Sequence, residues 1–220
     1  MKMKLLGISL QYMDVKGALK KTDSFLKTGS LKKIAYISAK KLVEASESED
    51  QKRWLEKMDL IVCEDIEVYK AANLWNKSRA KAVEEMEYLQ AVLKRMVKNE
   101  YGVFLLSDTR ENLVLLEEKL RTYQPDLLVV GKCATDQYET NMDSMINAMN
   151  LAAPKAILSK LPYPLGLDLM DQYHNFLNSS IWISLPEGLE LQKKSTLGKK
   201  MSQWLYHWTF RKKISKFDEK

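Results

Sequence analysis

Two adjacent acids, Glu64 and Asp65, directly follow the short apolar run Leu60–Cys63, which has the character of a buried strand. They would lie at the carboxyl end of that strand, where α/β proteins place their ligand sites. A carboxylate removed from water at such a position can act as a general base, so Glu64 is the candidate base and Asp65 stands beside it. The same acids, with Glu67, could instead form the solvated start of a helix, where each is stabilising by about 0.3–1 kcal/mol. Non-catalytic binding of a ligand is a third interpretation.

Other familiar chemistries have no support in the sequence. The two cysteines, Cys63 and Cys133, are expected to be buried free thiols near strand ends, which favours a reducing, cytoplasmic compartment. The two histidines, His174 and His207, are not spaced as metal ligands, and no Cys/His cluster suggests zinc. The chain has no G-x-G-x-x-G, P-loop or G-x-S-x-G motif, which argues against common dinucleotide, ATP and hydrolase sites.

Short apolar segments alternate with amphipathic helical segments along the chain. The expected strands are 5–10, 33–37, 60–63, 102–106, 127–130 (ended by Gly131), 156–158 and 181–183. The expected helical segments are 15–27 (capped by Asp14), a helix through Leu42 and Val43, 50–57, helices within 66–98, and then 109–123, 139–151 and 166–177. This order predicts an α/β fold, a Rossmann-like and mostly parallel sheet with helices on both faces.

The basic charge is concentrated in the last part of the chain. Of the formal net charge of +6, residues 193–220 carry +7, and residues 1–192 carry −1. We therefore expect a Rossmann-like domain over 1–192 and a basic, Trp-rich appendage over 193–220. A nucleic-acid binder would spread its charge over a face of the fold, so no nucleic acid is expected, and the tail is more typical of an attachment device.

The tail predicts a helix with two apolar stripes on nearly opposite sides and basic residues between them. One interpretation is contact with an anionic membrane surface or a membrane-associated protein, because aromatic rings suit headgroup depth and Lys/Arg attract anionic lipids. The alternative is that one stripe packs on the body of the protein and the other on a partner chain. The candidate membrane-binding residues are Trp204, Tyr206, Trp208, Phe210, Arg211, Lys212 and Lys213.

Five segments in order resemble the WecG/TagA/CpsF family of bacterial glycosyltransferases, over roughly residues 3 to 184. They read LLGISLQYMDVKGALKK, IAYISAKKLV, MDLIVCEDIEVYKAA, VFLLSDTRENLVLLEEKLRTYQPDLLVVG and PKAILSKLPYPLGL. The resemblance implies transfer of an N-acetylmannosamine-type sugar from a UDP-sugar to a polyprenyl-linked acceptor, without a metal ion or other cofactor. It implies work in cell-surface polysaccharide synthesis at the cytoplasmic face of the membrane.

The motif positions depart from the family pattern. By this resemblance, Glu64 occupies the position of the family's catalytic Asp, and Asp65 and Glu67 occupy the positions of its two glycines. Acids at those positions crowd the strand end and face an anionic diphosphate, at a cost of about 1–4 kcal/mol for like charges at ~4 Å. Where the family has Thr and Asn, this chain has the bulky ring of Tyr36 and the shorter Ser38.

The remaining motif positions are only partly retained. Pro164 is kept, but the Gln and Glu that follow it in the family have become Gly166 and Leu167. By resemblance, the residues that would bind substrate or nucleotide are Tyr36, Ser38, Ser107, Gly131 and Pro164.

The core segments match the family pattern, but most of the motif positions that would face a ligand do not. Three interpretations follow. The protein could be a divergent but working transferase that uses a UDP-sugar donor. It could be a non-catalytic partner or scaffold of an active glycosyltransferase paralogue, and self-association into a homo-oligomer is a further option. It could also be an unrelated α/β binding protein.

Overall fold

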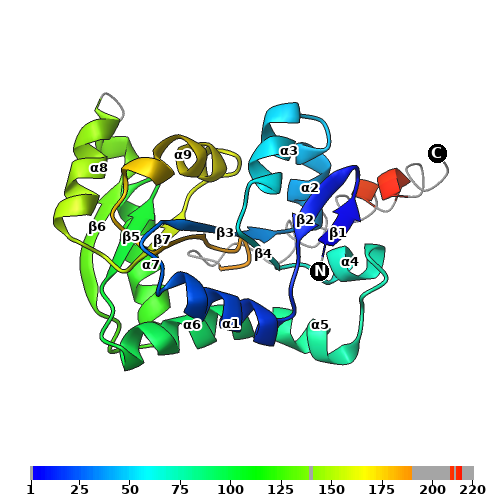
Figure 1. The fold of residues 1–220 in the computed structure, drawn as a ribbon, viewed down its shortest axis with the longest axis horizontal. Helices are drawn as coiled ribbons and strands as arrows, with labels where there is room; N and C mark the ends of the chain where they lie inside the picture. Colours follow the sequence, from blue (N-terminus) through cyan, green and yellow to red (C-terminus); the bar gives the residue numbers. More distant parts are fainter. Residues whose placement is uncertain (1, 139–140, 190–208, 211, 215–220) are drawn as a thin grey trace.

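The computed structural model describes residues 2–138, 141–189, 209–210 and 212–214, and its centre is a six-stranded sheet (Figure 1). The strand order is β4-β3-β8-β7-β5-β6, and all neighbouring strands pair in parallel. The strands are β3 (Lys32–Ile37), β4 (Leu60–Cys63), β5 (Val103–Ser107), β6 (Val129–Ala134), β7 (Ala156–Lys160) and β8 (Ile181–Ser184). This arrangement confirms the predicted α/β, Rossmann-like fold.

Helices cover both faces of the sheet, which explains why the central strands are continuously apolar. One face carries α1, α6 and α7, and the opposite face carries α2, α3, α8 and α9 (Figure 1). The helices are α1 (Val15–Phe25), α2 (Ala39–Ala45), α3 (Glu49–Glu56), α4 (Ile66–Ala71), α5 (Lys77–Glu84), α6 (Glu87–Lys98), α7 (Arg110–Tyr123), α8 (Met142–Leu151) and α9 (Leu165–Tyr173). Asp14 caps α1 as predicted, because its side chain accepts a hydrogen bond from the Gly17 amide at 2.8 Å.

Tight backbone turns divide two stretches of the chain. The single strand expected over 5–10 is an antiparallel hairpin, β1 (Lys2–Leu5) and β2 (Ile8–Gln11), and Leu6 and Gly7 between them have positive φ angles of 49° and 77°. The helices expected over 66–98 are α4, α5 and α6. Positive φ angles at Asn73 (54°) and Met86 (50°) mark the two breaks, although no Pro or Gly occurs there.

The strand boundary predicted at Gly131 is wrong. Gly131 lies inside β6, in register with Phe104 of β5. A Cβ atom at this position would lie 2.6 Å from the Phe104 ring, so the glycine allows the close approach of strand and ring. Cys133 consequently lies within the strand, and both cysteines are buried and free as predicted.

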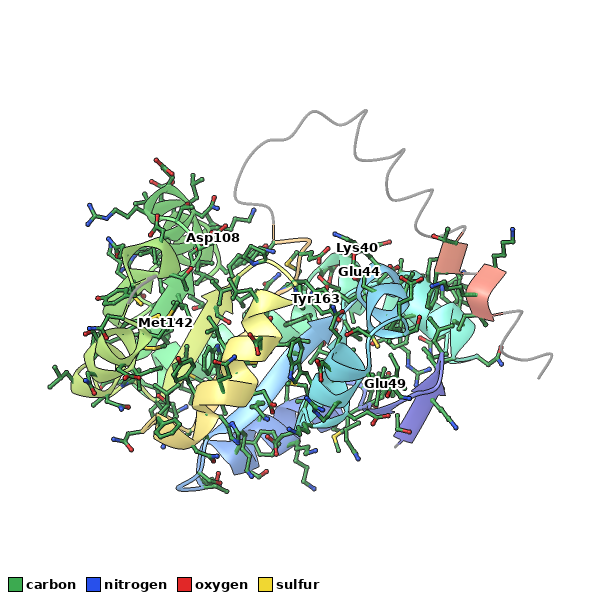
Figure 2. All side chains as sticks on the ribbon, turned by 90° about the horizontal axis from the view of Figure 1, so that it is seen from above. Lys40, Glu44, Glu49, Asp108, Met142 and Tyr163 are labelled. Atoms are coloured by element: carbon green, nitrogen blue, oxygen red, sulfur yellow. The ribbon has the colours of Figure 1, made fainter. Side chains whose placement is uncertain are left out.

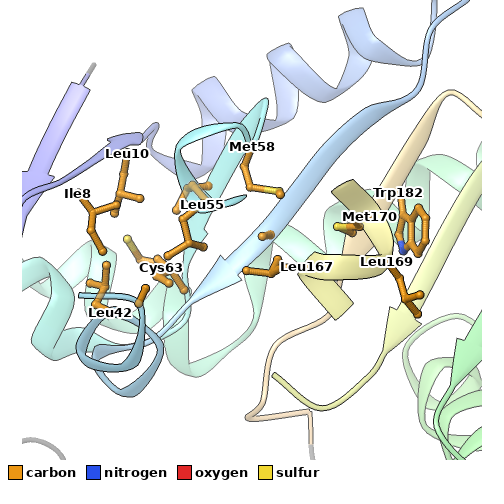
Figure 3. Close-up of a cluster of buried hydrophobic side chains, with 14 of the residues drawn as sticks. Ile8, Leu10, Leu42, Leu55, Met58, Cys63, Leu167, Leu169, Met170 and Trp182 are labelled. Carbon is orange, nitrogen blue, oxygen red and sulfur yellow. The ribbon is translucent and has the colours of Figure 1, made fainter. Parts of the chain in front are cut away.

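The larger of two buried apolar clusters lies between the sheet and the hairpin, α2, α3 and α9 (Figure 3). The short C-terminal helical piece, residues 209–210 and 212–214, belongs to the same cluster, because Phe210 is fully buried in it and Ile214 packs against it. Lys213 forms an ion pair with Glu47.

The expectation that Phe210 faces a membrane is therefore wrong, because its ring is part of the protein interior. This agrees with the alternative in which one stripe of the tail packs on the body. Lys212 is exposed. Trp204, Tyr206, Trp208 and Arg211 lie outside the described residues. Within the described ranges, no helix combines the length and apolar character needed to cross a membrane.

Candidate functional site

The predicted site residues gather mainly at the carboxyl edge of the sheet. Figure 2 shows Asp108 after β5 and Tyr163 after β7 on the same side of the molecule as Lys40 and Glu44 of α2. In open parallel sheets this edge is where ligands bind. Glu64 follows β4 directly and lies at this edge.

The carboxylate of Glu64 is held by two partners. Its Oε1 lies 2.6 Å from Lys41 Nζ, and each of these side chains is 6% exposed. Its Oε2 accepts a hydrogen bond from the Glu187 amide at 2.5 Å. Lys41 Nζ also donates to the Tyr36 carbonyl at 3.1 Å, so the ion pair is fixed to the end of β3. Glu64 is thus a buried, paired acid, and the solvated-helix interpretation is wrong for it.

Asp65 joins the beginnings of two helices. It is the N-cap of α4: its Oδ1 accepts from the Glu67 amide at 2.9 Å, and its Oδ2 accepts from the Ala39 amide of α2 at 3.2 Å. Glu67 is buried and pairs with Lys70 at 2.8 Å. The predicted helix start is therefore confirmed, but it is not solvated. The two acids on the family's glycine positions stabilise local structure.

The other candidate binding residues also make internal contacts. Ser38 is the N-cap of α2, and its Oγ accepts from the Lys41 amide at 3.2 Å. Ser107 is fully buried, and its hydroxyl donates to Asp108 Oδ1 at 3.1 Å. Pro164 precedes α9, and its carbonyl accepts from the Leu167 amide at 2.9 Å. Gly131 lies inside β6 and not at the strand's carboxyl end, so it is not part of this group.

Tyr36 occupies much of the space beside Glu64. Its ring is buried and meets the Tyr88 ring edge-on, with 6.0 Å between ring centroids. Burial raises the pKa of the Tyr36 hydroxyl well above its ordinary value, and the nearby Tyr88 and Glu64 add to the shift.

The cavity left beside Tyr36 has a volume of about 40 Å³. A single water requires about 10–15 Å³ by this kind of measure, so the space corresponds to on the order of three waters. Its lining is mostly apolar and includes Met13, Val15, Ala18, Val62, Met86 and Pro186.

A second, smaller cavity of about 10 Å³ lies on the other side of the Lys41–Glu64 pair. It is lined by Tyr36, Lys41 and Lys160, among others. Burial, with a contribution from the charge of Lys41, lowers the pKa of Lys160 to about 8. Lys160 Nζ donates to the Pro186 carbonyl at 2.7 Å.

Sequence reasoning missed both lysines of this site. Lys160 ends β7, so the rule that drew attention to Glu64, a charged residue at the carboxyl end of an apolar strand, could have found it. Lys41 lies in the first turn of α2, three residues after Ser38, where its burial could not be read from the sequence.

The model of the glycosyl transferase WecG/TagA/CpsF family matches residues 3–211. The chain belongs to this family. No curated protein matches the chain significantly. Membership in the WecG/TagA/CpsF family confirms the resemblance seen in the motifs. The match also extends beyond residue 184, where the recognisable motifs end, and includes the buried Phe210.

The WecG/TagA/CpsF framework and the predicted motif positions can be compared in this structure. The strands that carry the motifs form the expected parallel sheet. At the motif positions themselves, Ser38 and Asp65 cap helices and Glu64 is held in an ion pair. Most of the predicted site residues at the carboxyl edge therefore make their hydrogen bonds and ion pairs within the chain.

Proposed function

We propose that this protein acts in cell-surface polysaccharide assembly as a non-catalytic member of the WecG/TagA/CpsF family, the partner or scaffold of an active glycosyltransferase. The observation that carries the proposal is the engagement of both carboxylate oxygens of Glu64, one by Lys41 and one by the Glu187 amide. A general base needs an oxygen within about 2.6–3.2 Å of the hydroxyl that it deprotonates. Each oxygen of this carboxylate already accepts one hydrogen bond within the chain, so a substrate hydroxyl would have to share it with Lys41 or with the Glu187 amide.

The cavity beside Glu64 supports the same proposal. At about 40 Å³ it has room for a few waters, and we expect a nucleoside diphosphate to be enclosed there only if Tyr36 and its neighbours move. Tyr36 is held on β3 and packs on Tyr88, so a simple change of its side-chain rotamer would disturb the core.

A working transferase is the second candidate, and one observation favours it. Glu64 lies at the carboxyl end of β4, where the family has its catalytic Asp, and it lines the larger cavity. In that case Glu64 would be the base, and a UDP-sugar would be the donor for a polyprenyl-linked acceptor, without a metal ion. Glu64→Gln would then abolish transfer.

Calorimetric titration of the full chain with UDP and a panel of UDP-sugars tests the proposal. We expect no binding in the micromolar range, and clean micromolar binding by the wild-type chain would contradict the proposal. Tyr36→Thr provides a matched variant, because it places the family's small hydroxyl at this position. Binding gained only in Tyr36→Thr would show that the ring of Tyr36 closes the site.

The same proposal places the protein at the cytoplasmic face of the membrane, with the basic tail as the contact. Sedimentation with vesicles of phosphatidylglycerol and phosphatidylcholine, compared with phosphatidylcholine alone, tests this placement. We expect binding only to the anionic vesicles and a several-fold loss in Lys212→Ala, because a basic residue near an anionic surface contributes about 1 kcal/mol. Equal binding to both kinds of vesicle would contradict it.

A further inference from the structure

Residues 185–189, here called the strap, follow β8 and cross the carboxyl edge of the sheet. Leu185 and Leu189 are buried at its two ends, and Glu187 and Gly188 between them are exposed. The Leu185 amide donates to the Ser159 carbonyl at 2.8 Å, so the strap begins as an extension of the strand contacts.

One peptide unit of the strap is held from both sides by buried charged side chains. Lys160 Nζ donates to the Pro186 carbonyl at 2.7 Å, and Glu64 Oε2 accepts from the Glu187 amide at 2.5 Å. This carbonyl and this amide belong to the same peptide bond. Hydrogen bonds to charged groups are stronger than neutral ones, and a buried ion needs such partners.

The strap also forms a wall shared by the two cavities of the site. Pro186 and Gly188 line the larger cavity, and Leu185 and Glu187 line the smaller one. Tyr36 lines both. The strap therefore lies against both cavities, one lined by Glu64 and the other by Lys41 and Lys160.

We propose that Lys160 and Glu64 together form a binding site for a single main-chain peptide unit, and that the strap occupies this site as a built-in plug of the carboxyl edge. With the strap in place, Glu64 is held by Lys41 and by the Glu187 amide. Opening requires the Pro186–Glu187 peptide unit to leave both ions at once. This inference concerns the chain's own backbone and is independent of whether a nucleotide binds.

Hydrogen exchange of the full chain, followed by mass spectrometry, tests the plug. We expect the amides of Gly188 and Leu189 to exchange at least tenfold faster in Lys160→Met, while α9 and the start of β8 keep their wild-type rates. Lys57→Met, at the opposite edge of the sheet, is the matched control and should leave the strap unchanged.

Two results would overturn the proposal: wild-type exchange of the strap in Lys160→Met, or an acceleration that spreads equally over the whole sheet. A pair of strap variants tests the Glu64 side without removing either charge. Glu187→Pro removes the amide donor and should accelerate exchange at Gly188 and Leu189, whereas Glu187→Ala keeps the amide and should behave as wild type. Nucleotide titration of the wild-type chain is a separate measurement, so failure of one proposal does not imply failure of the other.

Discussion

The two edges of the sheet carry ion clusters of different character. At the amino edge, Lys33 and Lys57 converge on Asp171, at 3.5 and 3.1 Å, and the Lys57 side chain is 49% exposed. At the carboxyl edge, Lys41 and Glu64 are both buried, and their remaining hydrogen bonds go to backbone atoms. The amino-edge cluster joins β3 to α9, and its Lys57 side chain is open to water. The carboxyl-edge cluster lies where a ligand would bind. Its polar atoms instead form hydrogen bonds with backbone groups of the chain.

Removing one member of the carboxyl-edge pair should have the largest effect. Glu64→Gln leaves the Lys41 charge buried without its anion, so we expect a loss of about 3–5 kcal/mol in the free energy of unfolding. Lys57→Met removes a half-exposed ion-pair partner at the amino edge and should cost no more than about 1 kcal/mol. Urea denaturation measures both changes.

The double variant Glu64→Gln/Lys41→Met is the control for this comparison. It removes the unpaired charge, so it should recover much of the loss caused by Glu64→Gln alone. Equal, small losses at the two edges would show that the pair at the carboxyl edge is not effectively buried.

Lys160 gives the carboxyl edge a distinct response to alkaline pH. Its pKa is about 8 in the folded chain and 10.5 ordinarily, so between these values the folded chain binds fewer protons than the unfolded chain. Stability therefore rises with pH through this window. Lys160→Met should lack the rise, so that wild type gains about 2–3 kcal/mol relative to the variant between pH 7 and pH 10. Denaturant unfolding of both proteins from pH 7 to pH 10 measures this difference. The prediction is contradicted if the free energy of unfolding depends on pH in the same way in wild type and in Lys160→Met.

The sheet between the two edges should show a smaller effect than the loss of Glu64. Gly131→Ala places a methyl group 2.6 Å from the Phe104 ring and should destabilise the fold by about 1–3 kcal/mol. Gly29→Ala, where a methyl group meets no atom within 4 Å, should change stability by less than about 0.5 kcal/mol. Thermal unfolding of both variants measures the difference, and equal stability would argue that Gly131 is not required for packing.

Local pattern predicted much of the fold. The apolar run Leu60–Cys63 is β4, Asp14 caps α1, and Glu64 lies at the carboxyl edge. These features depend on neighbours in sequence. The breaks at Leu6 and Met86 could not be predicted in this way, because neither residue type favours a positive φ angle.

The contacts within the candidate site could not be predicted from the sequence. Glu187 and Glu64 are 123 positions apart, and nothing in either stretch indicates that an amide of one would bind the carboxylate of the other. The site could therefore be placed on the correct edge from sequence, but its closure by the strap depends on long-range packing.

The position of Phe210 decides how much of the chain must be retained to keep the sheet intact. The ring belongs to the same interior as the hairpin and α2, although it lies beyond the predicted domain boundary at residue 192. A shortened protein that ends at that boundary would contain a ring-sized hollow beneath its first two strands. Work on the isolated fold should therefore retain the sequence through residue 214.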